Sequence, residues 1–123
     1  MDFRVLIVDD NRSFLDAARV LLEREGVSVV GVCSTAAEAL RKAGELQPDV
    51  ALVDIMLAGD SGFELARNLV EHVRDGGPAV ILVSTHAEAD FGDLIAESPA
   101  VGFLPKSELS ADAIRLILDI RSG

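Results

Sequence analysis

The chain has 123 residues, a length that fits one domain of ordinary size. Half of the residues are hydrophobic and only 4% are aromatic, which predicts a sizeable aliphatic core. The formal net charge of −10 argues against direct binding of nucleic acid, because an acidic surface repels phosphates, and it suits a hydrated cation instead.

No apolar run in the sequence is long enough to span a bilayer, and the N-terminal stretch lacks the apolar segment of a signal peptide. The single cysteine, Cys33, excludes an internal disulfide and fits a reducing compartment. We therefore expect a cytoplasmic protein that does not associate with membranes, with Cys33 as a buried strand residue.

Short apolar runs rich in β-branched residues alternate with stretches of helical spacing, which gives five β-α pairs. The predicted strands cover residues 3–9, 27–33, 50–54, 79–84 and 101–105. The predicted helices run from about 14 to 25, from 35 to 47, from 61 to the "DGGP" at 75–78, from 90 to 97 and from 111 to about 120. Apolar strands separated by helices predict a doubly wound α/β fold, in which helices cover both faces of a five-stranded parallel sheet. We expect one domain over residues 1–123, with no second domain in this chain.

Capping residues stand where three of these helices are predicted to begin. Thr35 with Glu38, and Ser61 with Glu64, have the spacing of a capping box. Ser110 is suited to cap the last helix.

Polar side chains collect at the predicted carboxyl ends of the strands, where doubly wound folds hold their functional sites. They are Asp9 and Asp10 after the first strand, Asp54 in the third, Ser84 and Thr85 at the fourth, and Lys106 after the fifth. Each alone has an ordinary alternative, as a helix cap, a strand-end hydroxyl or a solvated lysine. Together they would place three carboxylates at one edge of the sheet, where they would raise one another's pKa. Mg²⁺ would relieve that repulsion, because it binds a few carboxylates together with water and phosphate oxygens.

Asp54 ends a strand that is otherwise apolar, so its carboxylate needs a partner or a function. If a phosphoryl group enters the site, Mg²⁺ and Lys106 could neutralise its oxygens and the Ser84 hydroxyl could donate to one of them. Asp54 would then be the nucleophile and would form an acyl phosphate.

Several motifs resemble the receiver domain of two-component response regulators, and the resemblance covers essentially the whole chain. They are "VDD" at 8–10, Asp54 with Gly62 eight residues later, Ser84 after "VILV", and "FLPKS" at 103–107. The separations 10 to 54, 54 to 84 and 54 to 106 match as well. The order "FLPKS" is similar to receivers that carry a helix-turn-helix DNA-binding domain. No such domain follows in this chain, so a stand-alone receiver and a part of a longer regulator both stay open.

The resemblance implies the flavodoxin-like strand order 2-1-3-4-5 and a signalling switch. It implies Asp54 as the phosphoacceptor for a sensor histidine kinase, with the domain catalysing only its own phosphorylation and dephosphorylation. It also implies Asp10, Asp54 and the backbone carbonyl of Met56 as Mg²⁺ ligands, with Asp9 acting through water.

The resemblance further implies Lys106 as the phosphate-binding lysine, Ser84 with the adjacent Thr85 as the switch hydroxyls, and Phe103 as the switch aromatic. The face made by the fourth helix, the fifth strand and the fifth helix would then change its partner preference and control a transcriptional output or a partner protein. A homodimer through that face stays open. His86 could tune the lifetime of the phosphoryl group or be a solvated loop histidine.

Two other functions share parts of this pattern. A phosphatase of the haloacid-dehalogenase type also uses a strand-end aspartate, Mg²⁺, a hydroxyl and a lysine, but its acids are spaced Asp-x-Asp whereas Asp9 and Asp10 are adjacent. An adaptor that keeps the fold without phosphorylation would not need all of these positions filled. A nucleotide-binding domain is disfavoured, because the turn "DDNRS" has no glycine to cradle a pyrophosphate.

Overall fold

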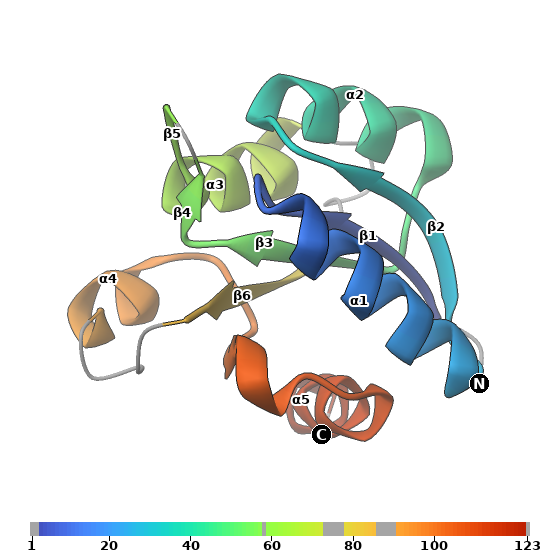
Figure 1. Ribbon diagram of the computed structural model, residues 1–123. Coiled ribbons are helices and arrows are strands. Elements are labelled where there is room, and N and C mark those ends of the chain that lie inside the picture. The colour runs from blue at the N-terminus through green and yellow to red at the C-terminus, as the bar shows by residue number, and fades with distance from the viewer. Residues whose placement is uncertain (1–2, 58, 73–77, 86–90, 123) are drawn as a thin grey trace.

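The computed structural model of the chain describes residues 3–57, 59–72, 78–85 and 91–122 (Figure 1). Its strands are β1 (Arg4–Val8), β2 (Ser28–Cys33), β3 (Val50–Asp54), β4 (Met56–Leu57), β5 (Asp60–Ser61), β6 (Ala79–Ser84) and β7 (Gly102–Pro105). Its helices are α1 (Arg12–Arg24), α2 (Ala36–Leu46), α3 (Gly62–His72), α4 (Gly92–Glu97) and α5 (Ala111–Ser122), with a 3₁₀ turn, η3 (Lys106–Glu108), before α5.

Five of the strands form one parallel sheet in the order β2-β1-β3-β6-β7. β6 and β7 are the fourth and fifth strands of this sheet in chain order, so its strand order is 2-1-3-4-5. The predicted flavodoxin-like fold is therefore confirmed. β1 and β3 are neighbours in the middle of the sheet. The residues at their carboxyl ends are therefore brought to the same point of one edge, next to the end of β6.

Helices cover both faces of the sheet, with α1 and α5 on one face and α2 and α3 on the other (Figure 1). Alternate residues of β1 explain this arrangement, since Val5 and Ile7 pack with α1 and α5 while Leu6 and Val8 pack with α2 and α3. Cys33 is buried in the second of these two cores, as expected for a strand residue. The apolar residues of the central strands are thus buried on both faces of the sheet, as in other parallel sheets.

The predicted element boundaries agree with the structure to within one or two residues for most elements. The third and fourth predicted strands coincide with β3 and β6, and α5 continues two residues beyond its predicted end. α4 begins at Gly92, whereas helix was expected from residue 90, which lies outside the described residues. None of the described helices is long and apolar enough to cross a membrane.

The predicted helix caps are present. Thr35 Oγ1 accepts a hydrogen bond from the backbone N–H of Glu38 (3.2 Å), and Ser110 Oγ accepts one from the N–H of Ala113 (3.0 Å). The carboxylate of Glu38 accepts in turn from Ser34, one residue before the expected donor (3.1 Å). The capping box of α2 therefore closes one residue earlier than the sequence pattern predicts.

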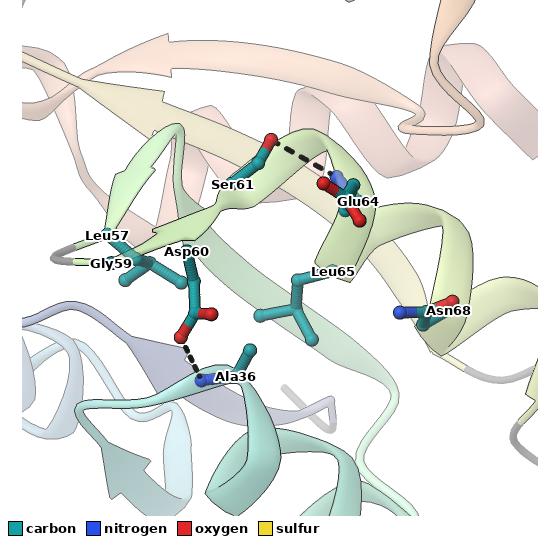
Figure 2. Close-up of a pocket in the computed structure, with 8 residues that line it drawn as sticks. All are labelled: Ala36, Leu57, Gly59, Asp60, Ser61, Glu64, Leu65 and Asn68. Carbon is teal, nitrogen blue, oxygen red and sulfur yellow. Dashed lines mark hydrogen bonds between the residues drawn. The ribbon is translucent and has the colours of Figure 1, made fainter.

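A small antiparallel hairpin follows β3, where the sequence suggested only a loop. Met56 pairs with Ser61 and Leu57 pairs with Asp60. One oxygen of Asp60 accepts a hydrogen bond from the backbone N–H of Ala36 at the start of α2 (3.4 Å). Figure 2 shows this contact at the edge of a pocket of about 410 Å³ between the hairpin, α3 and the start of α2. The chain after Asp54 is thereby attached to α2.

Gly62 permits the chain to turn from the hairpin into α3. A Cβ atom at this position would lie 2.1 Å from the carbonyl oxygen of Asp54 and 2.7 Å from the Cα of Ile55. The N–H of Gly62 also donates to the carbonyl of Ile55 (2.9 Å). The start of α3 therefore packs directly against the end of β3, in a contact that only glycine allows.

Candidate functional site

Three carboxylates meet at the carboxyl edge of the sheet. One oxygen each from Asp9, Asp10 and Asp54 lies within 4.8 Å of the others. Asp9 is fully buried, Asp54 is nearly so, and Asp10 is exposed. The cluster therefore has a buried floor and an opening to solvent on the side of Asp10.

Backbone N–H groups hold the two buried carboxylates in place. The N–H of Asn11 donates to Asp9 Oδ1 (2.8 Å), and the N–H of Met56 donates to Asp54 Oδ1 (3.2 Å). Asn11 also caps α1, because its side-chain oxygen accepts from the N–H of Phe14 (3.2 Å). The turn after β1 thus orients Asp9 and starts α1 at the same time.

Lys106 brings a positive charge to the cluster from the turn after β7. Its ammonium lies 2.5 Å from Asp9 Oδ2 and 3.4 Å from Asp54 Oδ2, and its side chain is only 13% exposed. On another side the ammonium lies over the ring of Phe14, 4.5 Å from the ring centre. This lysine is therefore enclosed by two carboxylates and an aromatic ring.

Burial raises the pKa of Asp54 above its ordinary value, and the negative charge of Asp9 raises it further. The N–H of Met56 and the ammonium of Lys106 act in the opposite direction, but the balance leaves the pKa raised. A single lysine thus compensates the buried carboxylates only in part.

The cluster offers ligands that suit a hard divalent cation. Among the described residues, Asp9 Oδ2 is a buried oxygen without a hydrogen-bond donor in good geometry, so its ion pair with Lys106 is its compensation. Carboxylate oxygens open to solvent on one side are the donors that Mg²⁺ prefers, because it keeps several of its waters. The residues present therefore fit Mg²⁺.

Ser84 and Thr85 lie beside this cluster at the end of β6. Ser84 is buried, is paired in register with Pro105 of β7, and directly follows Val83, which pairs with Asp54. Thr85, the next residue, is exposed. The end of β6 therefore lies between the end of β3, which carries Asp54, and the end of β7, which Lys106 directly follows.

The other predicted site residues lie around the cluster. Met56 contacts Asp54 through its backbone N–H, while its side chain is 58% exposed. Phe103 is half-buried and packs with Phe91 and Ile95 against the core on the side of α2 and α3. His86 lies outside the described residues.

The contact of Phe14 with Lys106 was not predicted, because Phe14 was interpreted only as an apolar residue of α1. A signal is nevertheless present in the sequence. In a chain with only 4% aromatic residues, Phe14 lies one helical turn after Asp10, on the helix that starts at the site.

Known proteins share both this sequence pattern and this fold. Residues 5–119 match the family described as the response regulator receiver domain. The chain is 32% identical over 121 residues to the response regulator GacA of Pseudomonas viridiflava, covering 98% of this chain and 56% of GacA. It is 31% identical over 116 residues to the transcriptional regulatory protein LiaR of Bacillus subtilis, covering 91% of this chain and 54% of LiaR.

A solved structure agrees with these relatives. The two-component response regulator of the LuxR family from Aurantimonas sp. SI85-9A1 superposes with a TM-score of 0.81 at 31% identity, covering 100% of this chain and 87% of that one. The chain spans about half the length of the curated relatives that it matches. Because the family match covers nearly all of the chain and the fold agrees with it, the chain belongs to the response regulator receiver domain family.

Proposed function

We propose that the chain is a single receiver domain in which Asp54 accepts a phosphoryl group from a sensor histidine kinase. Membership of the family makes phosphorylation-dependent signalling its general role. The observation that supports Asp54 as the acceptor is its place at the end of β3, within the acidic cluster and 3.4 Å from the ammonium of Lys106. Its N–H partner, Met56, occupies only one carboxylate oxygen.

In the proposed reaction, a carboxylate oxygen of Asp54 attacks the phosphorus of a phosphohistidine. The new O–P bond forms as the P–N bond breaks, and the imidazole nitrogen keeps the electron pair and takes up a proton. Lys106 pairs with one phosphoryl oxygen, and the hydroxyl of Ser84, with Thr85 beside it, donates to another. Water later attacks the acyl phosphate, so the domain catalyses only its own phosphorylation and dephosphorylation.

A bound Mg²⁺ would supply further positive charge against the phosphoryl oxygens. Asp10, Asp54 and the backbone carbonyl of Met56 are proposed to hold it, with Asp9 acting through water. The exposure of Asp10 and the buried floor formed by Asp9 and Asp54 support this assignment, since Mg²⁺ retains waters on its open side.

The proposed output surface consists of α4, β7 and α5. Phe103 of β7 is half-buried there, and Leu94 of α4 and Leu116 of α5 are exposed apolar residues. A rearrangement of Ser84 and Phe103 on phosphorylation would change what this surface binds. Relatives of about twice the length include a transcriptional regulatory protein. We therefore propose that this surface binds a transcriptional output domain, and that a second copy of the chain is another partner for it.

Intact-mass measurement with a small phosphodonor tests this proposal directly. The protein is incubated with acetyl phosphate, with and without Mg²⁺, beside Asp54→Asn and a matched Asp60→Asn variant. Asp60 lies in the hairpin close to the site, and asparagine retains an oxygen that can accept from Ala36. We expect a Mg²⁺-dependent gain of one phosphoryl group, labile to base, in the wild type and in Asp60→Asn but not in Asp54→Asn.

Three outcomes would contradict the proposal in different ways. A gain that persists in Asp54→Asn would mean that another residue is the acceptor. No gain, although Mg²⁺ binds, would favour an adaptor that is not phosphorylated or a receiver that accepts its phosphoryl group only from a specific donor. Repeated release of phosphate from a small phosphate ester would favour a phosphatase.

A further inference from the structure

We infer that Phe14 is a positioning residue, which holds the ammonium of Lys106 against the acidic cluster before the phosphoryl group arrives. The kinetic effect expected below rests on the proposed function, whereas the contact between Phe14 and Lys106 does not. The ammonium lies over the aromatic ring at 4.5 Å from its centre, well within the range of a cation–π interaction. Such an interaction is strongest where water is excluded, and the lysine side chain is only 13% exposed.

Phe14 is linked to the acidic cluster by a closed chain of contacts. The N–H of Phe14 donates to the side chain of Asn11, and the N–H of Asn11 donates to Asp9 Oδ1. The other oxygen of Asp9 pairs with Lys106, which returns to the ring of Phe14. The backbone that carries the ring is therefore linked to Asp9, the carboxylate with which Lys106 pairs.

The side chain of Phe14 also contacts the hydrophobic core. Phe14 is half-buried and packs against the core between the sheet, α1 and α5. Lysine has a long flexible side chain, and two carboxylates alone would let its ammonium adopt several positions around them. The ring occupies one side of the ammonium, and this favours the position next to Asp54 Oδ2, where a phosphoryl oxygen would need it.

Leucine at position 14 would retain apolar packing and would remove the π face. We therefore expect Phe14→Leu to fold and to leave Lys106 less confined. Phe14→Tyr retains the ring and should restore the wild-type behaviour. Phe3→Leu is a matched control, because Phe3 belongs to the same core, whereas the ring that lies against the Lys106 ammonium is that of Phe14.

The contact can be measured without any phosphorylation, because the chain contains only two lysines, Lys42 and Lys106. Protein labelled with ¹³C- and ¹⁵N-lysine gives one set of signals for each. A ring facing the ammonium shifts the signals of nearby protons upfield, so we expect the Cε protons of Lys106 to lie upfield of those of Lys42. Lys42, whose ammonium donates to the carbonyl of Val32, is the internal reference.

In Phe14→Leu the upfield shift of Lys106 should disappear, while in Phe14→Tyr and Phe3→Leu it should remain. An unchanged Lys106 signal in folded Phe14→Leu would overturn the inference. Signals for Lys106 that coincide with those of Lys42 in the wild type would overturn it as well.

The kinetic arm measures phosphorylation by acetyl phosphate at several donor concentrations. We expect the first-order rate constant at saturating donor to fall about three- to tenfold in Phe14→Leu, the loss that a desolvated cation–π contact implies, with recovery in Phe14→Tyr. Equal rate constants in Phe14→Leu and the wild type would refute the positioning role. If the wild type gains no phosphoryl group from acetyl phosphate or from a phosphorylated histidine kinase, the proposed function fails, and the lysine spectra still decide whether Phe14 holds Lys106.

Discussion

Replacing Gly62 with alanine should destabilise the protein more than any other glycine-to-alanine change considered below. The added Cβ would lie 2.1 Å from the carbonyl oxygen of Asp54 and 2.9 Å from its carbonyl carbon, whereas ordinary contacts begin near 3.4 Å. Both atoms belong to the backbone of β3, which is hydrogen-bonded to β1 and β6 on its two sides. Relief of the overlap therefore requires the end of a central strand to move by about 1 Å.

Overpacking of this kind costs about 1–3 kcal/mol, and a clash between backbone segments belongs at the upper end. We expect the free energy of unfolding of Gly62→Ala to fall by about 3 kcal/mol, with a decrease in Tm of about 12 °C for a domain of this size. Urea unfolding followed by circular dichroism, together with a thermal scan, measures both. Because the displaced residue is Asp54, we also expect weaker Mg²⁺ binding.

Two other glycines provide controls. Gly44 is exposed in α2, and no described atom lies within 4 Å of an added Cβ, so Gly44→Ala should stabilise the protein by about 0.5–1 kcal/mol. At Gly102 the near atoms belong to the side chain of Ile117, at 2.7 Å, and a side chain can shift, so we expect an intermediate loss of about 1 kcal/mol. A free energy of unfolding of Gly62→Ala that lies within about 0.5 kcal/mol of the wild-type value would refute the predicted clash.

Three further predictions concern other parts of the structure. Lys106→Met removes the ammonium between Asp9 and Asp54 while retaining the length of the side chain, so the Mg²⁺-free protein should lose about 3 kcal/mol of stability and Mg²⁺ should restore part of it. Urea titrations with and without Mg²⁺ measure this, and no response to Mg²⁺ would count against the proposed cation site. Thr35→Ala removes the side-chain acceptor at the start of α2 and should lower the free energy of unfolding by about 1 kcal/mol. An unchanged urea midpoint would show that this cap does not contribute to stability. Burial, assisted by the negative charge of a nearby glutamate, raises the pKa of Cys33 from 9.0 to about 12. Because the folded thiol holds its proton more tightly than the unfolded one, stability relative to Cys33→Ala should be constant below pH 9 and should fall as the pH rises from about 9 towards 12. At pH 8 the native thiol should react with a disulfide reagent much more slowly than free cysteine, because it is buried and holds its proton, and equal rates would contradict its burial.

The architecture was predictable because each large element leaves its own pattern in the sequence. Apolar strands of five or six residues, separated by helical spacing and capping residues, determine the order of the elements. The rule that parallel strands present their carboxyl ends at one edge then brings Asp9, Asp10 and Asp54 together without any structural information. Burial of Cys33 followed from its place near the end of a strand.

The hairpin after β3 was not predictable in this way. β4 and β5 have two residues each, too few for an alternating pattern, and their pairing depends on the packing of the start of α3 on the end of β3 at Gly62. The contact between Phe14 and Lys106 was missed for a related reason. The two residues lie far apart in the chain, and spacing alone does not reveal the side on which a long lysine side chain approaches the first helix.

The strand order has a consequence for the kinetics of folding. Every pairing in the main sheet is parallel and joins segments that are separated by at least one helix, so none forms by closure of a short turn. Loop closure must precede the gain from each pairing, which makes such sheets slow to form. Asp9 and Asp54 meet only when β1 and β3 pair across the intervening α1, β2 and α2. The acidic cluster is therefore absent from the unfolded chain and from any intermediate in which these two central strands are apart. If the cluster binds Mg²⁺ as proposed, the appearance of Mg²⁺ binding during refolding would report the formation of the centre of the sheet.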